Sequence, residues 1–232
     1  EYDLDNGLHV ILHQDNRAPV ITTSVQYHVG SKNEEVGRSG FAHFFEHLLF
    51  EGTKNIGSGE WFKIVEANGG SNNAYTTDDS TYYYEVFPSN KLELSLWMES
   101  ERMLHPIIRQ TDRIDLQEGV VKEEKNFRYR NAPYGGLLYA VRSQLYKVHP
   151  YGRLTIGLDK DLEAANIDDF IKFNSLYHKP NNATLVVAGD IDYEETKKLI
   201  KKYFDDIPSS SLDKNELPSE DLITETRRST WY

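Results

Sequence analysis

Two histidines and a glutamate lie close together in the sequence at a spacing that suits metal chemistry. The segment HFFEH places His43 and His47 four residues apart, so on a helix both imidazoles lie on one face, about 40° apart around the axis. Glu46 follows His43 by three positions and projects from the neighbouring stripe of that helix. The spacing predicts a metal ion held by both histidines, with Glu46 able to contact another ligand of that ion without binding it.

The order H-x-x-E-H mirrors the H-E-x-x-H order of zinc peptidases, so the predicted metal is zinc. Zinc with two histidine ligands needs a third protein ligand and keeps one position open. The chain has no cysteine, so this ligand must be an imidazole or a carboxylate. Glu123 and Glu124 are adjacent acids whose side chains diverge by about 100° on a helix, so only one can face the site. Spacing within the sequence does not choose between them.

The histidine segment must itself form a helix, and the apolar residues around it favour one. The stretch GFAHFFEHLLF over residues 40–50 has the apolar spacing of a largely buried helix. The two acids fall within a strongly charged helical pattern over residues 111–130.

The rest of the chain mixes strand patterns with helix patterns. Asp5-Asn6-Gly7 is a turn signal that predicts an opening hairpin, and Asp78-Asp79 predicts a second one. Strands are expected over residues 9–13, 20–29, 72–77, 80–87 and 183–187, and further helices over 59–68, 88–104, 137–148, 167–177 and 193–204. This order predicts an α+β fold: a mixed, mostly antiparallel sheet covered by helices.

Composition excludes several classes of partner. The 232 residues carry a formal net charge of −11, which disfavours nucleic acid and anionic membranes. No apolar run approaches 20 residues, so we expect neither a membrane span nor a signal peptide, and the start at Glu1 without Met suggests a processed or trimmed chain. The compartment stays open, and a periplasmic or other non-cytosolic location is only a guess.

The chain is long enough for one sizeable core. We expect a zinc-binding catalytic domain over residues 1–207. The character changes at Pro208-Ser209-Ser210-Ser211, and residues 208–232 are expected to form a linker leading to a second half that this sequence lacks.

The sequence resembles the N-terminal, zinc-binding half of pitrilysin/insulinase-family peptidases, the group that includes mitochondrial processing peptidase. The resemblance covers nearly the whole chain. It rests on matches in order: DNGL (5–8), GSKNE (30–34), GFAHFFEH (40–47), FEGT (50–53), NAYT (73–76), EE (123–124) and HPYG (149–152).

The resemblance implies roles for particular residues. In the family the third zinc ligand is a Glu about 77 positions after the second histidine, and 124 − 47 = 77 identifies Glu124. Family members usually carry another acid one heptad before that ligand, whereas this chain has Gln117. The strand with Asn73, Ala74 and Tyr75 resembles the family's edge strand, which pairs with the backbone of an extended substrate.

The implied function is zinc-dependent endopeptidase activity on peptides or unfolded protein segments. One Zn²⁺ per chain would be bound by His43, His47 and Glu124; zinc lowers the pKa of water, and Glu46 would be the general base. Full activity would need a homologous C-terminal half or partner subunit, so we expect this chain alone to bind zinc yet cleave poorly.

Two alternatives compete with this reading. One is a noncatalytic homologue that acts as a binding or assembly subunit; such members typically lose ligands or the base, and all are present here. The other is a structural zinc site closed by four ligands. His149 is expected to be structural, because the HPYG run is typical of a turn.

Overall fold

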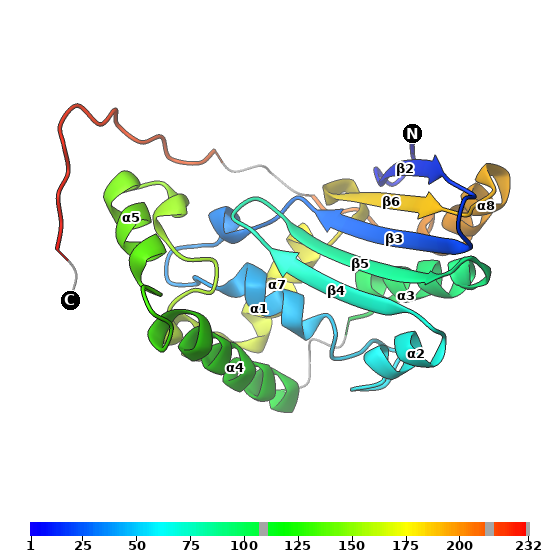
Figure 1. Cartoon of the computed structure of the whole chain (residues 1–232), viewed down its shortest axis with the longest axis horizontal. Coiled ribbons are helices and arrows are strands. Elements are labelled where there is room, and N and C mark those ends of the chain that lie inside the picture. Colours follow the sequence, from blue (N-terminus) through cyan, green and yellow to red (C-terminus); the bar gives the residue numbers. More distant parts are fainter. Residues whose placement is uncertain (107–110, 212–215, 231–232) are drawn as a thin grey trace.

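A six-stranded sheet forms the centre of the computed structural model, which describes residues 1–106, 111–211 and 216–230 (Figure 1). The strand order is β1-β2-β6-β3-β5-β4, and β2 and β6 form a parallel pair among antiparallel neighbours. This arrangement confirms the predicted mixed, mostly antiparallel sheet. The strands are β1 (Tyr2–Asp3), β2 (His9–Gln14), β3 (Val20–Tyr27), β4 (Ser71–Thr76), β5 (Thr81–Pro88) and β6 (Ala183–Gly189).

Helices pack against the sheet and against one another. Helices α1 and α3 contact its strands, α8 packs on α3, and α4 lies along the outer side of α1 (Figure 1). None of the described helices is long and apolar enough to cross a membrane. The helices are α1 (Phe41–Leu48), α2 (Trp61–Ala67), α3 (Leu92–Leu104), α4 (Thr111–Lys125), α5 (Leu137–Leu145), α6 (Asp159–Glu163), α7 (Ile167–Tyr177) and α8 (Tyr193–Phe204).

The predicted elements agree with the observed ones, with local differences. The charged helix predicted over 111–130 is α-helical only to Lys125 and continues as one π-helical stretch, η3 (Asn126–Arg130). The helix predicted over 137–148 ends earlier, at Leu145, because the HPYG run that follows forms the 3₁₀ turn η4 (Pro150–Gly152). The short helix α6 was not predicted, since five residues carry too little periodicity to detect.

Aromatic rings fix the position of α1 within the core. Phe41 and Phe45 of α1 stack on Phe170 and Phe173 of α7, with centroid separations of 5.1 Å for Phe41–Phe170 and 5.0 Å for Phe45–Phe173. Phe44 contacts Phe170 as well. These rings bury one face of α1, so the polar residues of the helix are confined to the other face.

A buried arginine of α3 joins the segment after α1 to α2 and β5. Arg102 of α3 is 1% exposed, and its guanidinium lies 4.1 Å from the ring centroid of Trp61 and 4.5 Å from that of Phe50. Its Nη2 lies 3.2 Å from a carboxyl oxygen of Glu99 and 3.7 Å from one of Glu85. Burial, aided by the charge of Glu99, raises the pKa of Glu85 to about 8. The cluster therefore holds the residues that follow α1 against the sheet.

The segment after α8 lies extended along the outside of the domain. Its described part, residues 208–211 and 216–230, contains no helix or strand. Glu220 accepts hydrogen bonds from the backbone amides of Val148 and His149, both at 2.6 Å, and Arg227 donates to the carbonyl oxygen of Leu145 at 3.3 Å. The segment thus contacts the C-terminal end of α5.

We expect Arg102→Met to lower the free energy of unfolding by about 3–5 kcal/mol, because it removes the cation from two buried carboxyl groups. The matched control is Arg17→Met, whose side chain is 90% exposed and whose effect should stay within about 0.5 kcal/mol. Urea denaturation of the two variants measures the difference. Equal stability of both would contradict a core role for Arg102.

Candidate active site

Buried acceptors fix the N-terminal end of α1. Gly40, which precedes the helix, has φ 92°, and a side chain there would lie 2.7 Å from the carbonyl oxygen of Ile156. The buried Glu34 carboxylate accepts hydrogen bonds from the backbone amides of Gly40 at 3.0 Å and Ala42 at 2.9 Å. These bonds satisfy backbone amides that have no partner within the helix, so Glu34 both caps α1 and sets its position.

Helices α1 and α4 bring three side chains together on the polar side of α1. Glu124 Oε2 lies 3.4 Å from His43 Nε2 and 3.3 Å from His47 Nε2. The ligand atoms of these three residues all lie within 4.8 Å of one another. Glu124 therefore joins two histidines that lie 77 and 81 positions earlier in the sequence.

These distances test whether the cluster fits zinc. Two donors bound at about 2.0–2.1 Å in a tetrahedral shell lie about 3.3–3.4 Å apart. The two separations from Glu124 agree with that value, whereas direct N–H···O hydrogen bonds are usually about 2.7–3.2 Å. Two imidazole nitrogens and one carboxylate oxygen are also a common donor set for catalytic zinc. The residues present fit the metal.

The charge states of His43 and Glu124 also suit a metal. Burial, followed by the proximity of His47, lowers the pKa of His43 to about 4, so His43 is neutral near pH 7. Burial opposes ionisation of Glu124, but contact with His47 and the charges of His43 and Arg128 outweigh it and lower the pKa of Glu124. A neutral imidazole and an ionised carboxylate are the forms that bind metal.

Glu123, the alternative acid, lies elsewhere. Its side chain is exposed and accepts a hydrogen bond from Asn126 Nδ2 at 3.2 Å. Glu124 points toward the histidines and also pairs with Arg128, one helical turn later, at 3.0 Å. The structure thus brings Glu124, and not Glu123, to the two imidazoles.

A short chain of hydrogen bonds orients His47. Gln117 Nε2 donates to Glu51, so its Oε1 faces His47 Nδ1, at 3.2 Å. His47 Nδ1 must then carry the proton, which leaves the lone pair of Nε2 directed at Glu124. The neutral Gln117 therefore keeps the orienting contact, and the nearby negative charge is that of Glu51.

Glu46 lies beside the cluster and contacts the edge strand. Its Oε2 accepts a hydrogen bond from Thr76 Oγ1 at 2.6 Å, which joins α1 to the last residue of β4. Burial, partly offset by this hydrogen bond, raises the pKa of Glu46 above its ordinary value. A carboxylate with a raised pKa is a better proton acceptor.

Strand β4 forms one edge of the sheet and has β5 as its neighbour. Tyr75 is 50% exposed and stacks on Tyr82, while Ala74 packs against the core. The backbone amide of Ala74 donates to Asn73 Oδ1 at 2.8 Å. The three predicted substrate-binding residues therefore lie on the strand whose end touches Glu46.

Sequence reasoning missed several residues of this site. Arg128 was detectable, because an arginine four residues after a glutamate on a helix is a common ion pair. Glu51 and Thr76 lie within the matched motifs FEGT and NAYT, but their contacts with Gln117 and Glu46 could not be predicted, because these depend on how separate segments pack. His149 has the structural role that we predicted: its Nδ1 accepts the amide of Tyr151 at 3.2 Å and begins the turn η4.

Comparisons with known proteins agree with this geometry. The family model described as insulinase (peptidase family M16) matches residues 9–157, and the model described as the peptidase M16 inactive domain matches residues 164–229. The zinc protease PqqE of Helicobacter pylori is 37% identical over 93% of this chain and 48% of its own length. The chain thus spans about half the length of that relative.

Solved structures have the same fold. A protease from Helicobacter pylori matches with a TM-score of 0.86 and 37% identity, over 94% of this chain and 52% of that one. The periplasmic protease PqqL of Escherichia coli matches with a TM-score of 0.86 and 28% identity, over 94% of this chain and 25% of that one. Sequence motifs, fold and a histidine–glutamate cluster agree, and the chain belongs to the insulinase family, peptidase family M16.

Proposed function

We propose that this chain is the zinc-binding half of an endopeptidase that hydrolyses peptides or unfolded protein segments. His43, His47 and Glu124 would hold one Zn²⁺, and Glu46 would be the general base. The observation that carries the proposal is the convergence of the three donor atoms within 4.8 Å, next to the half-buried carboxylate of Glu46. When bound, zinc would polarise the scissile carbonyl and lower the pKa of water.

Glu46 would move the proton. Thr76 holds Oε2 at 2.6 Å, so Oε1 is the oxygen available to accept a proton from water. The raised pKa of Glu46 favours uptake of that proton and its later delivery to the leaving amine. The hydrogen bond also keeps the carboxylate turned toward the edge strand, where the substrate would lie.

The substrate would bind as an added strand. An extended peptide can pair with the free edge of β4, with backbone hydrogen bonds that depend little on sequence. The amide of Ala74 would exchange its contact with Asn73 Oδ1 for a substrate carbonyl, and Tyr75 would contact side chains. A folded protein offers few free strands, so peptides and unfolded segments are the expected substrates.

A second homologous half or a partner subunit would complete the enzyme. The chain spans about half the length of the Helicobacter pylori relative, and we propose residues 1–207 as the catalytic domain and 208–232 as the connecting segment. A noncatalytic binding or assembly subunit is the alternative. The intact donor set with Glu46 beside it supports catalysis.

Replacing Glu46 by Gln tests the base. In the full-length protein with its second half, we expect Glu46→Gln to lower kcat for peptide cleavage about 100- to 10,000-fold, because the amide cannot accept the proton. Zinc content, measured by atomic absorption, should stay unchanged. Wild-type protein that holds zinc but cleaves no peptide would support the noncatalytic alternative instead.

A second test separates the two adjacent acids. Glu124→Ala should lose zinc on dialysis, because only two protein ligands remain, whereas Glu123→Ala should keep one zinc per chain. Metal analysis of the two purified variants gives the answer directly. Zinc retained in the first variant and lost in the second would overturn the ligand assignment.

The orientation of His47 can be tested without cleavage. Gln117→Ala should weaken zinc binding about 10- to 100-fold, since it removes the acceptor that fixes the proton on Nδ1. Competition with a chromogenic chelator measures the affinity, and the exposed Glu66→Gln is the matched surface control. Unchanged affinity in the Gln117 variant would refute the orienting role.

A further inference from the structure

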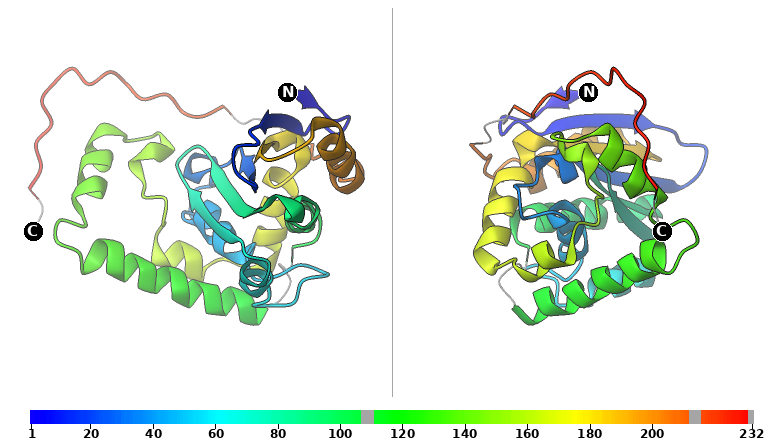
Figure 2. Two further views of the ribbon diagram at one scale, coloured as in Figure 1. Left: turned by 45° about the vertical axis from the view of Figure 1, so that its right-hand side comes forward. Right: turned by 90° about the vertical axis from the view of Figure 1, so that its left-hand side faces the viewer.

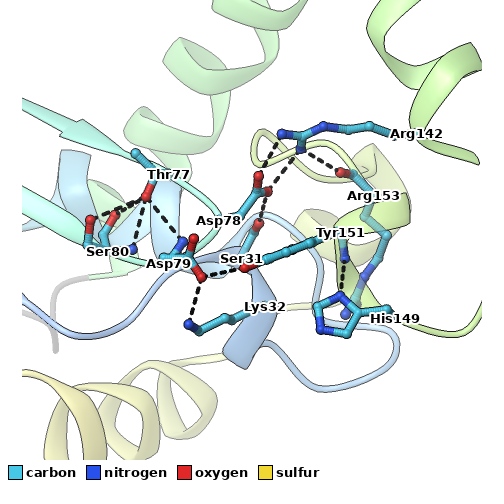
Figure 3. Close-up of polar contacts among 10 residues, drawn as sticks. All are labelled: Ser31, Lys32, Thr77, Asp78, Asp79, Ser80, Arg142, His149, Tyr151 and Arg153. Carbon is cyan, nitrogen blue, oxygen red and sulfur yellow. Dashed lines mark hydrogen bonds and ion pairs between the residues drawn. The ribbon is translucent and has the colours of Figure 1, made fainter. Parts of the chain in front are cut away.

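The turn between β4 and β5 is held from several sides by charged and polar groups. We call residues 77–80 the β4–β5 turn. Thr77 closes it internally: its Oγ1 accepts the backbone amides of Asp79 at 3.1 Å and Ser80 at 3.0 Å (Figure 3). The remaining contacts come from segments far away in the sequence. Thr77 therefore fixes the shape of the turn, and the distant segments fix its place in the domain.

Arg142 of α5 makes the strongest of these contacts. Its Nη1 donates to Asp78 Oδ1 at 2.9 Å and its Nη2 to Asp78 Oδ2 at 2.6 Å, so the two side chains form a pair of parallel hydrogen bonds (Figure 3). The two side chains are 24% and 17% exposed. Arg142 Nη1 also donates to the carbonyl oxygen of Arg153 at 3.2 Å, which limits its freedom to move. Paired, partly buried contacts of this kind are specific in geometry.

The other side of the turn contacts the segment after β3. The backbone amides of Ser31 and Lys32 donate to the carbonyl oxygens of Thr77 and Asp78. Gly30 permits this approach, since a side chain there would lie 2.5 Å from the backbone of the turn. The turn is therefore fixed on this side by main-chain contacts.

Asp79 is held by two further side chains. Lys32 Nζ donates to its Oδ1 at 2.6 Å, and Tyr151 OH donates to the same oxygen at 2.7 Å (Figure 3). These hydrogen bonds, that from Lys32 first, lower the pKa of Asp79, so it stays ionised. The turn thus has polar contacts on two faces.

The β4–β5 turn is directly linked to the site. Asp78 lies two residues after Thr76, whose hydroxyl contacts Glu46 at 2.6 Å. Strand β4 is at the edge of the sheet, so β5 is its only neighbouring strand within the described chain, and helices α1 and α2 contact it as well. A displacement of the turn would therefore move both the free edge of β4 and the partner of Glu46.

The contact with Arg142 does not serve the packing of a core. Among the described residues of α5, only Ala140 is buried, while Leu137 is 60% and Val141 47% exposed. Helix α5 stands away from the sheet, at the end of the molecule opposite α8 (Figures 1 and 2). Its C-terminal end is held by Glu220 and Arg227. Arg142 thus connects an exposed helix to the end of a functional strand.

We propose that Arg142 and Asp78 are positioning residues that hold β4 in the place where an extended peptide pairs with it. The proposal rests on the proposed endopeptidase function. A strand held in its bound place before the substrate arrives loses less conformational entropy on binding, and this favours affinity. Releasing the turn should therefore weaken peptide binding and leave the zinc ligands intact.

The test compares Arg142→Met and Asp78→Asn with Arg227→Met, which removes an arginine that contacts the carbonyl oxygen of Leu145 at the C-terminal end of α5 but not the β4–β5 turn. In the full-length, zinc-loaded protein, we expect the first two variants to raise KM for an extended peptide about tenfold or more, with kcat within about threefold. Arg142→Lys should restore part of the loss, because it keeps the charge but not the paired geometry. The Arg227 variant should match wild type.

Two measurements make the result independent of cleavage. Hydrogen exchange of the β4 amides should become faster in the Arg142 and Asp78 variants, without a change in zinc content. Binding of the same peptide should weaken equally when Glu46→Gln is added to prevent turnover. If wild type does not cleave at all, the proposed function fails while these two measurements still test the positioning role.

Other outcomes would overturn the proposal. Unchanged exchange of β4 in both variants would mean that the ion pair does not hold the strand. Faster exchange with unchanged peptide binding would mean that the position of β4 does not affect the affinity for the peptide. A loss of kcat at constant KM would place the effect on the chemistry of Glu46 instead.

Discussion

The contact of Glu124 with His43 and His47 brings two helices together, and most of the surrounding structure serves to maintain it. Removing polar side chains from water and gathering them against an aromatic core costs free energy. Helix α1 must therefore be held in place on its apolar face and at both ends. Phenylalanine rings of α1 stack on α7 and support the apolar face. Glu34 caps the N-terminal end of α1, and the buried Arg102 holds the residues that follow its C-terminal end. The site is thus a polar surface fixed on a rigid apolar base.

Much of the fold could be predicted from the pattern of residue types along the chain. Apolar spacing located α1, β-branched residues located β3, and aromatic residues after a turn signal located β5. The histidine pair was readable because both side chains share one helix. Glu51, Thr76 and Arg142 were not readable, since their roles depend on how separate elements dock, and local spacing carries no information about that. The end of α4 in a π-helical stretch was missed for a similar reason.

Gln117 illustrates how an orienting contact can persist when its charge is lost. An amide oxygen accepts the proton of His47 as a carboxylate would, but it contributes no full negative charge. Here Glu51 lies behind Gln117 and fixes which end of the amide faces the histidine. Orientation and charge are separate contributions to a metal site, and this chain assigns them to two residues.

The free edge of β4 has a further consequence. Proteins commonly protect the edges of sheets with very short strands, lysine or proline. The opposite edge follows this practice, since β1 has only two residues, whereas β4 is six residues long and its sequence SNNAYT contains neither charge nor proline. If β4 binds extended peptides as proposed, the same edge would also pair with the strand of another molecule. A long edge strand without charge or proline favours self-association and aggregation, and the net charge of −11 opposes both by mutual repulsion.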